Sequence, residues 1–321
     1  MKTIPENKKS ETGGWWMSLH GVPLLMTGER ALFLPDAPCT GTTSGSTGGK
    51  TDTGNDASTD GSTGDSSGGT PTLILSDTHF GKAETFQEHG IPVPTDHTAR
   101  DLDRLRKLVH VHSARRIIIL GDLFHSTRNS SWDRVLAGFQ SMEEIELILV
   151  MGNHDIIHRH DYESIGFTCV PGMPCGPFYL QHHPPEHMEI NDQASTASRT
   201  QNDEASAAPL TQNDDKPELP LRHPDSESPS GITSEALSIS KSKSESPSPL
   251  LICGHLHPSF RIKGPARQRI TLPCFWLRPG YLVLPAFGSF TGSHPVQARP
   301  DDLVLLAAGD SVIPHSHEPD V

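Results

Sequence analysis

Three short apolar runs in the first half of the chain constrain its fold most, because each of them ends in a polar motif. The runs PTLIL, RIIIL and ELILV are followed by Ser-Asp-Thr-His, Gly-Asp-Leu-Phe-His and Met-Gly-Asn-His-Asp. Runs of this length and composition predict buried strands, and the segments between them are long enough for helices. Alternating strands and helices predict a parallel sheet whose polar carboxyl ends meet along one edge.

Two segments between these runs have helical periodicity. Residues 96–113 place Leu102, Leu105 and Val109 on one stripe, and Asp96 or the threonine before it stands where a capping side chain is expected. The second segment, SWDRVLAGFQSMEEI, follows the second apolar run. Both segments are expected to be helices that connect neighbouring parallel strands.

The rest of the folded chain is rich in strand sequence. A β-region is expected over residues 13–35, where a turn-like MTGER separates WWMSL from ALFL. Five later apolar runs have little helical sequence between them: FYLQHH, LLICGHLH, RITLPCFWL, YLVLPAF and DLVLLAA. Early βαβ units followed by a β-rich half predict an α/β fold, a mixed sandwich with parallel strands at its centre.

Two stretches of low complexity interrupt this pattern. Residues 37–70 are almost all Gly, Ser, Thr and Asp, and residues 191–248 are rich in Ser, Pro, Asp and Glu. Neither stretch has enough apolar residues to offset the entropy lost on ordering, so both are expected to be disordered insertions in one domain, residues 12–315. Counted with Asp36, residues 36–70 carry −4 and residues 191–247 carry −5 of the net charge of −13, which leaves −4 for the remainder and excludes few partners.

The five cysteines give no indication of a disulfide scaffold. They are Cys39, Cys169, Cys175, Cys253 and Cys274, and no Cys-x-x-Cys pair occurs. Cys169 and Cys175 are close enough in sequence to bind a metal or form a bridge, but buried free thiols are the favoured interpretation. The N-terminus lacks the apolar segment of a signal peptide, and no segment approaches the length of a membrane span. A cytoplasmic, reducing location without membrane attachment is therefore expected.

A fourth strand end adds histidines to the three motifs above. The run LLIC is followed by Gly-His-Leu-His, and the stretch QHHPP supplies further histidines between the third and fourth motifs. Each motif alone is a weak signal, because Asp-x-His occurs by chance and Gly-Asn-His-Asp is more often a capped turn. Four such motifs, each directly after an apolar strand, predict a metal site. Their mixture of carboxylate, imidazole and amide groups favours a pair of divalent cations such as Mn²⁺, Fe²⁺ or Zn²⁺ over Ca²⁺ or Mg²⁺ alone.

This series of motifs resembles the calcineurin-like metallophosphoesterase superfamily, whose fold is a two-sheet mixed sandwich flanked by helices. The segments GKAETFQEHGIPVP, GDLFHS, CGHLHP, LPCFWL and LPAFGSFTG further resemble the bacterial ligase-associated DNA damage response endonucleases of the PdeM type. The similarity covers residues 14–36, 71–190 and 249–310, and both low-complexity stretches fall outside it.

The resemblance implies two groups of metal ligands that share one carboxylate. The first group is Asp77, His79, Asp122 and His257, and the second is Asp122, Asn153, His255 and one histidine of the QHHPP stretch. His182 is the expected member of that stretch, with His183 as its rival. Asp122 would bridge the two ions, because each oxygen of a carboxylate can face one cation.

Four further residues are expected to support the reaction or to bind the substrate. His154 would stabilise the transition state or protonate the leaving oxygen, with Asp155 fixing its tautomer. His125 would face the scissile phosphate, as in nuclease members of the superfamily, with a surface or core-satisfied histidine as the alternative. Lys82 would bind a substrate phosphate together with Asn153, or else is a solvated lysine after a glycine turn.

The function implied is hydrolysis of phosphodiester bonds by a DNA endonuclease or phosphodiesterase that acts in DNA repair. Its cofactors would be two divalent ions, Mn²⁺ first and Fe²⁺ or Zn²⁺ as alternatives. Its partners would be single-stranded or damaged DNA and, by family association, a DNA ligase and a helicase. The competing interpretations are a small-molecule phosphatase or phosphodiesterase that does not act on DNA, and a non-catalytic scaffold, which the complete ligand set disfavours.

A cluster of cations follows the fourth motif. Arg261, Lys263, Arg267 and Arg269 fall within nine residues, enough for a face that follows the phosphates of a nucleic acid. The charged tip of a β-hairpin explains the same cluster equally well, and the sequence leaves both interpretations open.

Overall fold

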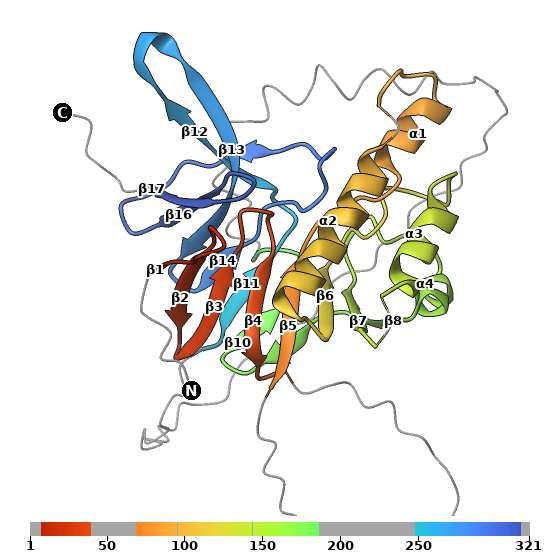
Figure 1. Cartoon of the computed structure of the whole chain (residues 1–321), viewed down its shortest axis with the longest axis horizontal. Helices are drawn as coiled ribbons and strands as arrows, with labels where there is room; N and C mark the ends of the chain where they lie inside the picture. Colours follow the sequence, from red (N-terminus) through yellow and green to blue (C-terminus); the bar gives the residue numbers. More distant parts are fainter. Residues whose placement is uncertain (1–7, 40–68, 95, 143, 186–247, 316–321) are drawn as a thin grey trace, which may run out of the picture. The chain divides into compact units, whose positions relative to one another are not determined.

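The structure, a computed structural model, describes residues 8–39, 69–94, 96–142, 144–185 and 248–315. Within this part of the chain, two mixed β-sheets pack against each other and α-helices cover the first of them (Figure 1). The first sheet consists of β1 (Lys8–Lys9), β2 (Trp15–Leu19), β3 (Val22–Met26), β4 (Leu32–Ala37), β5 (Thr70–Leu75), β6 (Arg116–Leu120), β7 (Glu146–Val150) and β8 (Phe167–Val170).

The second sheet consists of β9 (Met173–Cys175), β10 (Phe178–Leu180), β11 (Leu250–Cys253), β12 (Pro258–Lys263), β13 (Arg269–Arg278), β14 (Tyr281–Val283), β15 (His294–Pro295), β16 (Leu303–Ala307) and β17 (Val312–His315). The helices are α1 (Lys82–Glu88), α2 (His97–His112), α3 (Trp132–Gln140) and α4 (Arg159–Ile165), and a 3₁₀ turn, Pro265–Arg267, lies between β12 and β13.

The first sheet follows the order of the chain from edge to edge. Its strands β1 to β5 are antiparallel neighbours, whereas β5 to β8 are parallel and are connected through helices. Because successive strand residues point to opposite faces, Leu73 and Leu75 pack against the helices, whereas Ile74 packs toward the second sheet. The βαβ units expected from the sequence are therefore present, and the carboxyl ends of β5, β6 and β7 lie side by side.

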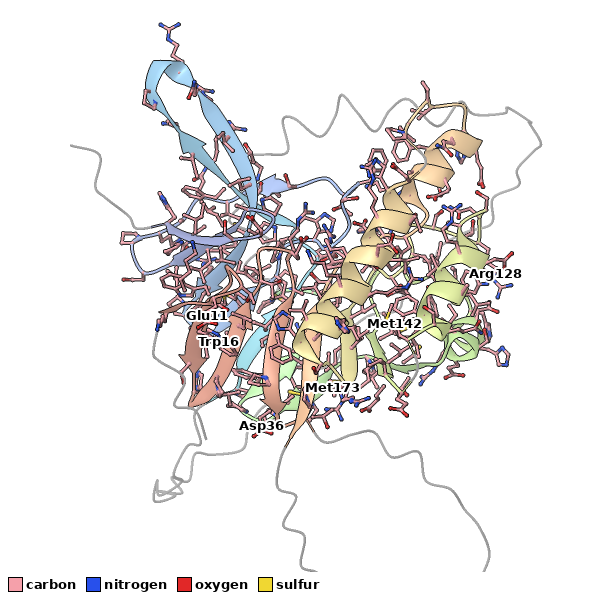
Figure 2. The ribbon with its side chains drawn as sticks, viewed as in Figure 1. Glu11, Trp16, Asp36, Arg128, Met142 and Met173 are labelled. Carbon is pink, nitrogen blue, oxygen red and sulfur yellow. A yellow bond between two sulfur atoms is a disulfide. The ribbon has the colours of Figure 1, made fainter. Side chains whose placement is uncertain are left out.

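The second sheet completes the core from the other side. Ile252 and Phe275 of this sheet belong to the same buried cluster as Ile74, Ile118 and Ile148 of the first sheet. Figure 2 shows side chains filling the space between the two sheets. β11 has β10 and β14 as parallel neighbours, and β13 pairs antiparallel with β12, β14 and β16. The predicted two-sheet mixed sandwich is confirmed.

The predicted helices are present with small differences. α2 begins one residue after the expected start and buries Leu102 and Leu105, with Val109 packed partly against the same cluster. Asp96 occupies the N-cap position, but its side chain makes no capping hydrogen bond and instead forms an ion pair with Arg100. The expected capping role of this side chain is therefore wrong, because the guanidinium one turn later takes its carboxylate.

Some elements could not be expected from the sequence pattern. α1 and α4 have seven residues each, too few for helical periodicity to show, and tertiary packing determines them. On the outer side of α3, Arg128 lies 4.1 Å above the ring of Trp132 and pairs with Asp161 of α4 at 2.6 Å (Figure 2). Contacts of this kind connect the short helices to one another.

The two expected insertions lie almost entirely outside the described residues. Both ends of the first insertion, however, belong to strands: Ala37 of β4 pairs with Thr70 of β5 in the first sheet, which makes this insertion shorter than residues 37–70. Separately, none of the described helices has both the length and the apolar composition needed to cross a membrane.

The expectation of free thiols is wrong for one cysteine of the proposed pair. Cys175 forms a disulfide with Cys39, 136 residues away, because β9 and the residues after β4 both contribute to the core between the sheets. Cys169 is a free buried thiol, as are Cys253 and Cys274. Disulfides are typical of oxidising compartments, so this bridge does not support the expected reducing location.

Candidate metal centre

Strand pairing and hydrogen bonds between the loops bring the four sequence motifs together. Parallel pairing aligns the carboxyl ends of β5, β6 and β7. The amide of Asp77, after β5, donates to the carbonyl of Gly121, after β6, at 3.1 Å. The amide of His255, after β11, donates to the carboxylate of Asp77 at 3.0 Å. The carboxyl ends of β5, β6 and β7 in the first sheet and of β11 in the second sheet therefore supply side chains to one site.

The first expected ligand group is assembled. Coordinating atoms of Asp77, His79 and His257 lie within 4.8 Å of one another. Nε2 of His257 is 3.2 Å from Oδ1 of Asp77, and Nε2 of His79 is 3.5 Å from Oδ2 of Asp122. Two carboxylates and two imidazoles thus face one small volume, a donor set that suits a transition-metal dication.

The second expected group lies on the other side of Asp122. Nε2 of His182 is 3.5 Å from Oδ1 of Asp122 and 2.9 Å from Oδ1 of Asn153. Nδ1 of His255 lies 3.2 Å from the same Nε2. The two oxygens of Asp122 therefore face different ligand groups, Oδ2 the first and Oδ1 the second.

The geometry favours His182 over His183 as the ligand from the QHHPP stretch. His182 is 1% exposed, and its Nδ1 lies 2.8 Å from the carbonyl of Leu120. A carbonyl only accepts, so Nδ1 carries the proton and the lone pair of Nε2 points into the site. His183 is exposed, and its ring packs against those of His182 and His255 at the margin of the site.

The electrostatics of the site fit a bound cation. Among the described residues, neither ring nitrogen of His79 has a hydrogen-bond partner although both are buried, which is costly unless another group satisfies them. Burial lowers the pKa of His79 to about 2 and that of His255 to about 4, so both rings are neutral and have a free lone pair. Burial raises the pKa of Asp77, but the adjacent His257, His182 and His79 outweigh it and bring the pKa to about 2.

The backbone at the site is strained in a recurrent way. The φ angles of Asp77, His79, Asp122, His255 and His257 are 53°, 44°, 55°, 70° and 45°. Non-glycine residues adopt this left-handed region rarely, and such strain concentrates at functional sites. These five residues are all expected metal ligands, so the chain accepts unfavourable backbone conformations in order to direct ligand atoms into one volume.

The glycines of three motifs are required by close approach to the ligands. A Cβ on Gly121 would lie 2.2 Å from Nδ1 of His182, and one on Gly152 would lie 2.4 Å from Oδ1 of Asp122. A Cβ on Gly254 would lie 2.5 Å from Oδ2 of Asp77. Because atoms cannot approach this closely without a bond, only glycine leaves room for the ligand side chains.

Asp155 has a different contact from the one expected. Its carboxylate accepts hydrogen bonds from the amides of Asp122, Leu123 and Gly152 at 2.8–2.9 Å. Nδ1 of His154 instead lies 3.0 Å from the carbonyl of His125. The expectation that Asp155 fixes the tautomer of His154 is therefore wrong: Asp155 holds two of the ligand-bearing loops together, and the His125 carbonyl orients the His154 ring.

The side chain of His125 lies between two aromatic rings. It stacks on His154 at 5.5 Å between ring centroids and on Phe86 at 6.3 Å. Burial, with smaller contributions from Lys82 and His154, lowers the pKa of His125 to about 4, so the ring is neutral. Coordinating atoms of His79, His125 and His154 lie within 4.8 Å of one another, so His125 faces the site rather than solvent alone.

Lys82 begins α1 next to this histidine group. Its side chain is half-buried, and burial lowers the pKa of its ammonium. In the described part of the chain Lys82 has no ion-pair partner. A desolvated cation beside the ligand groups can bind an anion, which agrees better with the expected phosphate contact than with a solvated lysine.

A group of charged residues that the sequence analysis did not single out supports the loop after β14. Ser289 donates to Asp101 of α2 through its amide at 2.8 Å, and Arg104 lies 4.1 Å above the ring of Phe287. Arg30 donates to the carbonyl of Gly288 at 3.2 Å. The signal was available: Asp101 is charged and adjoins Leu102 on the buried stripe of α2, where a carboxylate requires a partner.

The fold and these clustered aspartates and histidines define a metal-dependent phosphoester hydrolase. The chain belongs to the calcineurin-like phosphoesterase family, whose model matches residues 70–259. This confirms the superfamily that the motif series resembles.

Two solved structures show how far the likeness extends. Nuclease MPE from Pseudomonas putida is 20% identical with a TM-score of 0.54, and the match covers 94% of this chain and 100% of that chain. Yfce, a phosphoesterase from E. coli, is 14% identical with a TM-score of 0.32, over 75% of this chain and 96% of that chain. The likeness to the nuclease supports the fold of the whole described domain. No curated protein matches this chain significantly.

Proposed function

We propose that this protein is a dinuclear-metal phosphodiesterase that cleaves DNA as an endonuclease. The observation that carries the proposal is the position of Asp122, whose two carboxylate oxygens face two separate groups of ligand atoms. A single structural metal would need one such group, and a scaffold protein would need neither. The proposed ligands are Asp77, His79, Asp122 and His257 for one ion, and Asp122, Asn153, His182 and His255 for the other.

Divalent cations held by these residues would activate a water molecule and neutralise charge on the phosphoryl oxygens. Mn²⁺ is the proposed ion, with Fe²⁺ and Zn²⁺ as alternatives, because neutral imidazoles and carboxylates bind all three. The strained backbone directs the ligand atoms into one volume, and the glycines leave room for the ligand side chains.

The remaining roles belong to side chains around the ligands. His154 has its Nδ1 occupied by the His125 carbonyl, which leaves Nε2 to exchange a proton with the leaving oxygen. The neutral ring of His125 packs directly against His154 and would contact the phosphate as a hydrogen-bond donor. The ammonium of Lys82 and the amide of Asn153 would bind the non-reacting phosphoryl oxygens.

A nucleic acid is favoured over a small molecule by the aromatic side chains next to the site. Phe86 stacks on His125, and Phe290 contacts Phe86 at 5.8 Å and His97 at 4.8 Å between ring centroids. Phe86 and Phe290 are half-buried, so part of each ring is available for stacking by a base. The likeness to a nuclease agrees with this choice. Single-stranded or damaged DNA is the proposed substrate, and a repair ligase and helicase are the proposed partners.

The test is an assay of the purified protein with Mn²⁺ on three substrates: linear single-stranded DNA, circular single-stranded DNA and a small phosphodiester. Cleavage of the circle is expected, because an endonuclease needs no free end. Hydrolysis of the small diester without cleavage of either DNA would contradict the proposal and favour the small-molecule phosphodiesterase. Metal analysis of protein purified without a chelating tag should show two divalent ions per chain.

A further inference from the structure

The β12–β13 hairpin (residues 258–278) begins directly after the metal centre and carries an unusual charge. His257 is an expected ligand, and Pro258 is the first residue of β12. Residues 246–300 contain six Lys and Arg residues and no Asp or Glu, in a chain with a net charge of −13. Four of the six lie on the distal part of the hairpin and are exposed: Arg261, Lys263, Arg267 and Arg269. Figure 1 shows the hairpin extending beyond the other strands of its sheet.

Three of these cations share one face of the hairpin. Lys263 pairs with Arg269 and Arg261 pairs with Thr271 across the two strands. Because residues two apart in a strand share a face, Arg261, Lys263 and Arg269 lie together. The opposite face carries Ile262, which packs with an apolar cluster of the second sheet. Like charges directly opposite each other destabilise a hairpin, and no ion pair within the described residues relieves this repulsion.

The fourth cation also occupies a position that its side chain does not favour. Arg267 ends the 3₁₀ turn between the strands with φ 63°, a left-handed conformation that glycine adopts without strain. The hairpin thus has one cation at its turn and one pair of cations across its strands, and both features lower local stability. Local conflicts of this kind are expected where a residue is kept for function.

We propose that the β12–β13 hairpin is a nucleic-acid arm, which binds the phosphate backbone of a strand while one phosphodiester of that strand lies at the metal centre. The inference rests on the proposed function and adds to it the surface that selects a polymer over a small diester. Phosphates, spaced regularly along a strand, are the anions that a row of unpaired arginines and lysines next to a phosphoesterase centre would bind.

The length of the arm sets the length of strand that it contacts. Lys263 is five residues beyond Pro258, which corresponds to about 17 Å along a strand. Stacked nucleotides follow one another by about 3.4 Å, so the arm reaches about five nucleotides from the metal centre. A dinucleotide has one phosphodiester and is too short to occupy the arm and the centre together.

The experiment compares the hairpin variant Arg261→Gln/Lys263→Gln/Arg269→Gln with wild type and with a control variant, Lys8→Gln/Lys9→Gln/Lys107→Gln. The control residues are exposed and without ion-pair partners in the described structure, and the control changes the net charge by the same amount. Arg267→Gly is a fourth protein, which removes the turn cation and relieves its backbone. The probes are a thymidine dinucleotide and a labelled 12-mer of the same base.

Two measurements are made on each protein: kcat/KM with Mn²⁺ on both probes, and anisotropy titration of the 12-mer in chelator at several salt concentrations. The hairpin variant should lose at least about tenfold in kcat/KM on the 12-mer and remain within about twofold on the dinucleotide. Its slope of log affinity against log salt should be smaller by about 2, for three lost phosphate contacts on a single strand. Arg267→Gly should show the same pattern at about one third of the change in slope, and the control should match wild type.

Each other outcome identifies what fails. If the slope of log affinity against log salt is unchanged in the hairpin variant, the proposal that the hairpin binds nucleic acid is wrong. Cleavage of the 12-mer by wild type would still support the proposed function. Binding of the 12-mer that depends on the hairpin, without cleavage of either probe, supports the arm and contradicts the proposed function. An equal loss in the control variant overturns the arm in favour of net charge. Binding to phosphatidylserine vesicles but not to the 12-mer overturns it in favour of a membrane contact.

Discussion

The metal centre and the β12–β13 hairpin are adjacent in the chain but are organised in opposite ways. In the centre, Asp77 and Asp122 are 0% and 2% exposed, and their positions are fixed by hydrogen bonds between loops. In the hairpin, the cations are exposed and none has an ion-pair partner among the described residues. Both regions contain backbone strain, but in the centre it directs ligands inward, whereas at Arg267 it accompanies a charge directed to solvent.

The proposed function and the proposed arm assign bond cleavage and the holding of a polymer to separate parts of the chain. A buried centre is sensitive to any change in its packing, because each ligand supports the next. An exposed hairpin tolerates substitution, and its charges act additively and depend on salt. Changes in the centre should therefore affect every substrate, whereas changes in the hairpin should affect only long ones.

The largest effect is expected for Asp122→Ala, which removes the carboxylate shared by both ligand groups. Turnover should fall by at least about 10³-fold on DNA and on a small diester alike, because the loss concerns the chemistry and not the substrate. Steady-state kinetics on both substrates measure this. A variant that lost activity only on DNA would break the distinction between the centre and the hairpin.

Asp155→Ala should destabilise the fold rather than act on the substrate. The change leaves the amides of Asp122, Leu123 and Gly152 without their acceptor in a buried region, which should lower the free energy of unfolding by about 3 kcal/mol or more. Urea denaturation of the metal-free protein measures this. Asp155→Asn is the matched control and should cost less, since one amide oxygen remains to accept. Equal stability of wild type and Asp155→Ala would show that the loops are held by other contacts.

His154→Ala should lower kcat by about 10²-fold on DNA, the usual contribution of a general acid. From a p-nitrophenyl diester, the nitrophenolate leaving group departs without protonation. On that substrate the loss of kcat should therefore be much smaller. The ratio of the two losses is the measurement. Equal losses on both substrates would contradict proton transfer by His154 and leave it a role in charge stabilisation.

The metal-free centre should be less stable at acidic pH. Burial lowers the pKa of His79, His125 and His255 to about 2, 4 and 4, so the folded state binds fewer protons than the unfolded state below pH 6.5. Stability is therefore expected to fall as the pH drops from about 6.5 toward 4.

The pKa of His257 is shifted in the opposite direction. Burial lowers this pKa, but Asp77 raises it above its ordinary value. Protonation of His257 therefore stabilises the folded state at acidic pH, whereas the other three imidazoles destabilise it. Thermal melts in chelator across this pH range measure the net effect. A melting temperature that rose on acidification would mean that the site imidazoles are not held neutral.

The smallest effect is expected on the stability of the hairpin, where the strained residue lies in an exposed turn and not in the buried centre. Arg267→Gly should raise the free energy of unfolding by about 0.5 kcal/mol, because relief of the left-handed strain exceeds the entropy that glycine adds to the unfolded chain. Arg267→Ala keeps the strain and is the control for loss of the charge alone. A large loss of stability in Arg267→Gly would show that the arginine is structural.

Much of the fold, and the clustering of the candidate ligands, could be predicted from the sequence. The buried runs before Asp77, Asp122 and Asn153 have a composition typical of strands in a central parallel sheet, and parallel strands align their ends. The gathering of the expected ligands follows from this alignment together with β11. The metal pair itself, and the assignment of His182 over His183 from its buried position, stay predictions until a metal-bound structure or metal analysis tests them.

The parts that could not be predicted depend on contacts between distant segments. The carboxylate of Asp155 is next to His154 in sequence but turns to amides 33 and 32 residues away. The disulfide of Cys175 pairs it with Cys39 rather than Cys169, because strand order, not spacing in sequence, decides which ends adjoin. Seven-residue helices such as α4 carry too little periodicity to be recognised.

The pairing of Ala37 with Thr70 has a practical consequence. The chain departs from the first sheet and re-enters it at neighbouring positions, so the sheet imposes no particular length on what lies between. The entropy of closing such a loop grows slowly, by about 0.6 kcal/mol for each doubling. This junction is therefore a natural place to shorten the polypeptide for crystallisation, or to graft a fluorescent reporter without disturbing catalysis.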